Sequence, residues 1–272
     1  MSLPKAVLHW YIRGSIHVSL ALISLVAFTG NVMEVPVSPH YYAALFFGSI
    51  AVYNAIKYGL EPGKHISSVP GGLRALGAIS LLSFLIALYQ LSFLPHHVWM
   101  LLLLCGGITA VYAIPVMPGR RNLRSFGLLK VLMVALVWTI SSLWVPVWGH
   151  WPAVSWDLSV ESFQRVLWVI LLMLPFEIRD ADLDPPSLRT IPQRLGIGRT
   201  RSISWWGVVI FVGATWLKDN PVEGEVFTKA VTGLLMGFST AYAPGVDKWY
   251  YTAFWVEGIP IVSLFLLILF QG

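Results

Sequence analysis

The sequence predicts an all-α integral membrane protein of about nine transmembrane helices in a bundle. Of its 272 residues, 57% are hydrophobic and 11% are charged, and the mean hydropathy is +0.72. Soluble domains carry about 25% charged residues, so this composition is typical of a chain made for lipid. Two further observations support this class: apolar segments recur along the whole chain, and basic residues gather in alternate connections.

Nine apolar segments are long enough to cross a bilayer, or nearly so. They leave almost no chain for a soluble domain, so residues 1–272 are predicted to form a single polytopic transmembrane domain. The first is expected to stay in place as a membrane helix, because no small-residue cleavage site follows it. The seventh and eighth are short. The segments are expected at 14–33, 41–60, 73–94, 97–117, 126–148, 161–180, 203–217, 227–243 and 252–270.

The basic residues predict the orientation. Fifteen of the eighteen Lys and Arg belong to the N-terminal tail, the even-numbered connections or their flanks. The other side holds only Arg165, Lys218 and Lys229. By the positive-inside rule, the N-terminus and the even connections are expected in the cytoplasm of a plasma (inner) membrane protein, and the C-terminus outside. The fifteen are Lys5, Arg13, Lys57, Lys64, Arg74, Arg120, Arg121, Arg124, Lys130, Arg179, Arg189, Arg194, Arg199, Arg201 and Lys248.

Several function classes are disfavoured by composition. The net charge of +5 reflects loop placement in a membrane protein and does not indicate a nucleic-acid partner. The single Cys105 lies within an apolar run and supports neither a disulfide framework nor a metal cluster. The seven histidines are dispersed, and the adjacent His96 and His97 fall at a short outer turn.

The most informative stretch is EIRDADLD, Glu177 to Asp184, at the end of the sixth apolar segment. It holds four of the chain's thirteen Asp and Glu. If the helix continues, Glu177, Asp180 and Asp184 stand at i, i+3 and i+7 and share one face, whereas Asp182 points elsewhere. Three stacked carboxylates repel one another unless a cation lies among them, and Mg²⁺ prefers oxygen ligands. The pattern therefore predicts a metal-assisted anion site at the membrane surface; a solvated, charged helix end is the plainer alternative.

Two other connections on the same side are basic. Residues 53–74 include Asn54, Lys57 and Lys64, and residues 112–130 include three arginines and Lys130. Each is explained separately by the positive-inside rule. Together with the acidic stretch they predict a mouth where acids lie beside bases, and a metal with Lys and Arg is suited to holding a diphosphate.

The sequence resembles the UbiA superfamily of intramembrane prenyltransferases. The stretch FEIRDADLDPPSLRTIPQRLG, residues 176–196, is similar to that family's second Asp-rich motif, with Glu177 in place of the first Asp. Its tail matches at Thr190, Pro192, Leu195 and Gly196. The segment YAIP at residues 112–115, followed by basic residues, resembles the motif after the family's fourth span.

The resemblance implies a helical bundle around a central cavity, closed on the cytoplasmic side by the loops after spans two and six. Members move a prenyl group from its diphosphate to an aromatic or lipid acceptor, with Mg²⁺ helping the diphosphate to leave. Carried onto this chain, the resemblance makes Asp180 and Asp184 catalytic and gives Mg²⁺ the ligands Glu177, Asp180 and Asp184. The groups expected to contact phosphate or to orient ligands are Asn54, Lys57, Lys64 and Arg189.

The family's first Asp-rich motif is degraded in this chain. Asn54 matches, but the acidic positions that should follow it read Ala55, Tyr58 and Pro62, and Lys57 stands within the motif. Three functions therefore remain open. The first is an enzyme acting on an isoprenoid or related lipid diphosphate. The second is a non-catalytic lipid-binding or scaffold subunit with a protein partner. The third is a transporter, disfavoured because the acidic cluster lies at one mouth and most mid-span positions are apolar.

Overall fold

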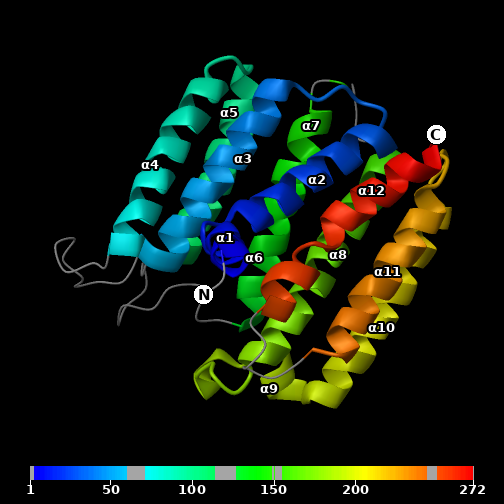
Figure 1. Ribbon diagram of the computed structural model, residues 1–272. Coiled ribbons are helices and arrows are strands. Elements are labelled where there is room, and N and C mark those ends of the chain that lie inside the picture. Colours follow the sequence, from blue (N-terminus) through cyan, green and yellow to red (C-terminus); the bar gives the residue numbers. More distant parts are fainter. Residues whose placement is uncertain are drawn as a thin grey trace.

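The computed structural model describes residues 3–59, 71–113, 127–148, 150, 155–243 and 250–271, and within these ranges the regular structure is entirely helical (Figure 1). The α-helices are α1 (Leu3–Arg13), α2 (Ile16–Val32), α3 (Pro39–Asn54), α4 (Gly71–Leu91), α5 (His96–Ala113), α6 (Gly127–Thr139), α7 (Val145–Val147), α8 (Trp156–Asp180), α9 (Ile191–Leu195), α10 (Ile197–Gly213), α11 (Glu225–Ala241) and α12 (Ile259–Gln271). The π-helical segments are η1 (Ala55–Gly59), η4 (Ile140–Trp144) and η7 (Tyr251–Val256), and the 3₁₀ turns are η5 (Pro186–Leu188) and η6 (Ala214–Leu217).

Each of the nine predicted segments coincides with a helix or a continuous run of helical segments. Five helical runs of the described chain are long and apolar enough to cross a membrane, or six if the bent pair α1 and α2 forms one span. The runs formed by α3 with η1 and by α10 with η6, and helix α11, are not among these candidate spans. The prediction of a multi-pass helical bundle is therefore confirmed, whereas nine full spans are not.

The long helices pack side by side in an order that differs from the chain order. Helix α4 lies against α3, and the series continues through α2, α12, α11, α10, α8, α6 and α5. In the described residues the two ends of this series, α4 and α5, share no extended contact. The C-terminus lies at the opposite end of the bundle from α9 (Figure 1).

The break in the helix at η4 frees backbone carbonyls that accept hydrogen bonds from neighbouring helices. Pro146 has no N–H to donate to the carbonyl of Ser142, four residues earlier, and the π-helical η4 lies just before it. The freed Ser142 carbonyl accepts from the Thr29 hydroxyl at 2.8 Å, and the neighbouring Ser141 carbonyl accepts from the Tyr41 hydroxyl at 2.5 Å. In a bilayer no water would replace these bonds, so α2 and α3 are fixed against η4.

Five charged side chains are buried together at the end of the bundle away from α9. Glu161 of α8 pairs with Arg165 at 3.1 Å and with Lys229 of α11 at 2.7 Å. Lys229 also pairs with Glu225 at 2.8 Å, and Glu225 accepts from Lys218 at 2.7 Å. All five are buried. This group is called the outer ion network below, after the side on which the basic residues predict this end of the bundle to lie.

Arg165 connects the outer ion network to the rest of the bundle. Its guanidinium donates to the Leu25 carbonyl at 3.0 Å, the Ser142 hydroxyl at 2.8 Å and the Thr29 hydroxyl at 3.0 Å. The sequence predicts Arg165, Lys218 and Lys229 on the side opposite the even-numbered connections; the structure adds that their side chains are buried. They lie inside the protein because carboxylates from α8 and α11 meet them there.

Removing one carboxylate from the outer ion network is expected to destabilise the whole bundle. Glu161→Gln keeps the side-chain shape but leaves Arg165 and Lys229 without their shared anion. Breaking a buried ion pair from one side costs about 3–5 kcal/mol. The midpoint of thermal unfolding in detergent should fall clearly below that of the wild type. Asp182→Asn makes the same carboxylate-to-amide change at an exposed position and should leave the midpoint unchanged; equal midpoints for both variants would contradict this role.

Candidate functional site

The predicted mouth is assembled where the C-terminal end of α8 meets the first turn of α6, with η1 and η7 beside them. Glu177 and Asp180 lie in the last turn of α8 and Asp184 in the turn that follows. The backbone N–H of Asp184 donates to the Asp180 carbonyl at 2.8 Å, which closes the helix end. This group of residues is called the acidic motif below.

Lys130 of α6 lies between two carboxylates of the acidic motif. Its ammonium is 2.5 Å from Glu177 Oε1 and 3.8 Å from Asp184 Oδ2. The Glu177 side chain is only 1% exposed, so this is a buried ion pair with one neighbour at longer range. Glu177 Oε2 and Asp184 Oδ2 are buried and have no hydrogen-bond partner in the described structure.

The third carboxylate, Asp180, is held by Arg179. The Arg179 guanidinium donates to both Asp180 oxygens, at 2.7 and 2.8 Å, in the bidentate geometry that suits this pair. It also donates to the Thr252 hydroxyl of η7 at 2.5 Å and lies over the Phe176 ring, 5.2 Å from its centroid. Arg179 therefore links the acidic motif to the last helical run of the chain.

A close backbone approach fixes the acidic motif against α6. A Cβ added to Gly127 would lie 2.7 Å from the Thr190 Cα and 2.9 Å from the Leu188 carbonyl oxygen, so glycine is needed at this crossing. Gln193 of α9 holds the preceding turn, because its amide donates to the Asp184 carbonyl at 2.8 Å and accepts from the Thr190 N–H at 3.1 Å. Lys130 lies one helical turn beyond Gly127 and so reaches the carboxylates.

The degraded first motif forms the opposite wall. The Ser15 hydroxyl donates to the Asn54 amide oxygen at 2.8 Å and accepts from the Lys57 ammonium at 3.1 Å. Ser15 has a positive φ of 61° at the 61° bend between α1 and α2, which brings its hydroxyl to this position. Glu257, after η7, interacts electrostatically with both Lys57 and Arg179. Asn54 and Lys57 therefore face the same mouth as the acidic motif.

The structure does not test the other two predicted contact residues, Lys64 and Arg189. Lys64 lies outside the described residues. Arg189 is exposed at the end of η5 with φ 51°, so the structure leaves its predicted role untested.

An apolar cavity of about 440 Å³ adjoins the mouth. It lies between α3 and α4 on one side and α5 and α6 on the other, and its walls are mainly aliphatic and aromatic. Tyr53 and Tyr112 line its inner end; the Lys57 ammonium is 5.8 Å from the Tyr53 ring centroid, and Tyr112 interacts electrostatically with Lys130. Phe84 of α4 and Leu103 of α5 line it as well and are 48% and 70% exposed, so the cavity opens outward between these helices.

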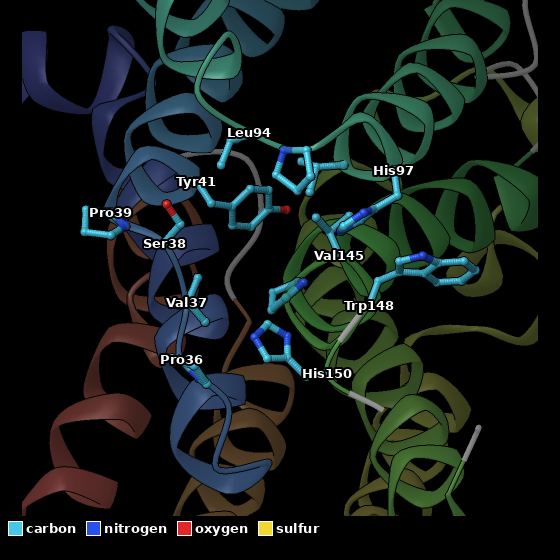
Figure 2. A pocket seen from close by; sticks show the side chains of 13 residues that line it. Pro36, Val37, Ser38, Pro39, Tyr41, Leu94, His97, Val145, Trp148 and His150 are labelled. Carbon is cyan, nitrogen blue, oxygen red and sulfur yellow. The ribbon is translucent and has the colours of Figure 1, made fainter. Parts of the chain in front are cut away.

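A second pocket of about 480 Å³ lies among the connections at the other end of the bundle (Figure 2). The rings of Tyr41, His97 and Trp148 surround it, and His150 lies at its edge in this view. None of its lining residues carries a permanent charge. It therefore has no cation to neutralise an anionic group and is remote from the acidic motif.

The described residues do not fit the Mg²⁺ site that the resemblance implies. No group of three or more His, Cys, Asp or Glu in the described ranges is placed to hold a metal ion. The position between Glu177 and Asp184 has the Lys130 ammonium beside it, and both oxygens of Asp180 are taken by Arg179. The metal-ligand and catalytic roles given to these carboxylates thus remain predictions, and no step below depends on a metal.

Three residues of the site were not predicted from the sequence as site residues: Lys130, Arg179 and Glu257. Lys130 and Glu257 were the ones with a signal, because each is a lone charge within an apolar segment, and such charges in membrane proteins usually have a partner and a purpose. Arg179 sits inside the acidic stretch itself and was counted only as a positive-inside residue.

Comparisons with known proteins establish the fold. No family model and no curated protein sequence matches the chain. A solved structure described as giving structural and mechanistic insights into digeranylgeranylglyceryl phosphate synthase in membranes does match, with a TM-score of 0.57 over 96% of this chain and 95% of that chain, at 15% identity. At this identity the likeness shows the fold alone: the chain has the helical-bundle fold of that membrane synthase structure.

Proposed function

We propose that this protein is an intramembrane transferase that moves a prenyl or related lipid group from its diphosphate to an acceptor. The observation that carries the proposal is the continuity between the apolar cavity and the cationic mouth. Tyr53 and Tyr112 belong to the cavity wall, and Lys57 and Lys130 lie directly beyond them. A prenyl diphosphate has the same division into a long apolar chain and an anionic head.

The mouth offers three cations to an anionic head group. Lys57, Lys130 and Arg179 come from three different elements, η1, α6 and α8. Arg13 of the N-terminal tail and Arg74, Arg189 and Arg194 of the even-numbered connections or their flanks are exposed, and the basic residues predict the same side of the membrane for all four. Such a basic surface attracts anionic substrates and holds them near the cavity.

In the proposed reaction the bond between the prenyl C1 and the diphosphate oxygen breaks. The electron pair leaves with the diphosphate, and a nucleophilic atom of the acceptor forms a bond to C1 and loses its proton. Fixed cations at the mouth stabilise the negative charge that grows on the leaving oxygen. The apolar cavity excludes water, which would otherwise capture the prenyl cation. We further propose that this mouth faces the cytoplasm, as the basic connections predict.

A second candidate function is lipid binding without turnover, as a subunit of a larger membrane assembly. One observation favours it: each described carboxylate of the acidic motif is already beside a cation of the chain, and the facing motif has lost its acids. Incubating the purified protein with a prenyl diphosphate and mixed lipid acceptors separates the two. Prenylated product supports the transferase; retained, unreacted prenyl diphosphate and a co-purifying protein partner support the subunit.

A larger side chain in the cavity is expected to restrict the protein to shorter prenyl chains. Gly106 of α5 lines the cavity, and a side chain there meets no atom within 4 Å. Gly106→Leu should weaken binding of a C20 prenyl diphosphate about tenfold, since an obstructed chain forfeits the burial of one or two methylenes at about 0.8 kcal/mol each. A C10 analogue should bind unchanged.

Gly107→Leu is the matched control, because its added side chain is equally unobstructed but Gly107 does not line the cavity. Binding measured by scintillation proximity in nanodiscs should show no chain-length dependence for this variant. If both variants behave alike, the cavity is not where the chain binds.

Arg179 is expected to contribute to binding of the diphosphate head group and not to binding of the prenyl chain. Arg179→Met should lower the affinity for a C20 prenyl diphosphate about tenfold, the loss of one charge-assisted hydrogen bond, and leave the affinity for the C20 alcohol unchanged. Arg199→Met, at an exposed arginine of α10, should alter neither. An equal loss for diphosphate and alcohol would show that Arg179 acts on the fold alone.

A further inference from the structure

Lys130 is the only charged residue in helix α6, whose sequence is GLLKVLMVALVWT. A charge in such a helix is expensive unless it is paired, and the side chain of Lys130 is 15% exposed. Its partners are both from the acidic motif: Glu177 at 2.5 Å and Asp184 at 3.8 Å. These are the first and third acidic positions of the motif, one on α8 and one on the turn after it.

The ammonium therefore stands where carboxylates separated by seven positions converge. Such convergence ordinarily requires a cation, because like charges at short range disfavour ionisation. A divalent ion bridging Glu177 and Asp184 at the usual Mg²⁺–oxygen distance of about 2.1 Å would lie next to the ammonium and be repelled by it. Lysine and metal are thus alternatives at this position.

The opposite wall shows the same replacement. Where acidic residues would complete a metal cradle, the chain has Ala55 and Tyr58, and Lys57 points its ammonium to Ser15 and interacts electrostatically with Glu257. Each wall of the mouth therefore carries a lysine that interacts electrostatically with an acidic side chain of another element.

We propose that Lys130 takes the place of the divalent cation at the acidic motif, so that this mouth is organised and binds an anionic lipid head group without a metal. Within the described structure its ammonium uses one of three N–H donors, on Glu177, since Asp184 at 3.8 Å is beyond hydrogen-bond distance. The remaining donors are free to bind phosphate oxygens. This inference deepens the proposed function and rests on it for the mouth as the head-group site, but its test does not require turnover.

The experiment is Mn²⁺ binding, followed by electron paramagnetic resonance, to the purified full-length protein. The wild type should show no bound Mn²⁺ that depends on Glu177. Lys130→Met removes the ammonium at similar volume and should gain one Mn²⁺ site, which the double variant Lys130→Met/Glu177→Gln should lose again. Lys130→Arg, which keeps a cation, should gain none. A wild-type Mn²⁺ site that Glu177→Gln abolishes would overturn the proposal, and so would a folded Lys130→Met variant that gains no site.

A second measurement serves if Lys130→Met does not fold. Binding of a C20 prenyl diphosphate to the wild type should be the same in EDTA as in millimolar Mg²⁺, and a loss of binding in EDTA would overturn the proposal. If the wild type binds no prenyl diphosphate under either condition, the proposed function fails, whereas Mn²⁺ binding to the wild type and to Glu177→Gln still tests whether the acidic motif holds a metal.

Discussion

Pairing of charges inside an apolar bundle is the constraint on which the structure depends most. The Glu161 carboxylate lies between Arg165 and Lys229, and the same guanidinium reaches a carbonyl of α2 and a hydroxyl of η4. A single buried anion thereby joins elements from the beginning, middle and end of the chain. Neither an aliphatic replacement at one position nor water could provide this, because the unpaired partner would remain buried.

The two ends of the bundle apply this constraint differently. In the outer ion network every charged side chain is enclosed, so it serves the fold. At the mouth the pairs are half-open: Arg179 and Asp180 are 16% and 28% exposed, and Glu177 and Asp184 each keep one buried oxygen without a hydrogen-bond partner. Pairs that are satisfied by the protein alone hold helices together, whereas pairs with unused donors and acceptors can exchange partners with a ligand.

Helix positions were predictable because hydrophobic length is a local property of the sequence. All nine apolar segments became helical runs, and the acidic motif fell at the end of α8 as expected. The number of spans was less predictable, since α10 and α11 are short and continue into 3₁₀ or irregular turns.

Only the wall of the site that holds the acidic motif was predictable from the sequence. Glu177 and Asp180 on α8 and Asp184 in the turn after it could be grouped from their spacing, but their partners include Lys130, which comes from a segment far away in the chain. Lys130 is about fifty positions from the acidic motif, and its approach depends on the glycine crossing at Gly127. Likewise, Arg165 and Lys229 resembled loop charges until α8 and α11 were placed side by side. Spacing along one helix is visible in a sequence, whereas pairing between helices is a property of the packing.

The opening of the cavity between α4 and α5, beside Phe84 and Leu103, has a consequence for how a ligand reaches the protein. Phe84 and Leu103 line the cavity and are exposed, so within a bilayer this opening would face the hydrocarbon phase, whereas the other end of the cavity adjoins the mouth. A hydrophobic molecule that enters there diffuses in two dimensions, and its occupancy follows its mole fraction among the surrounding lipids. Dilution of the protein in buffer would then leave occupancy unchanged, while dilution of the ligand within the bilayer would lower it.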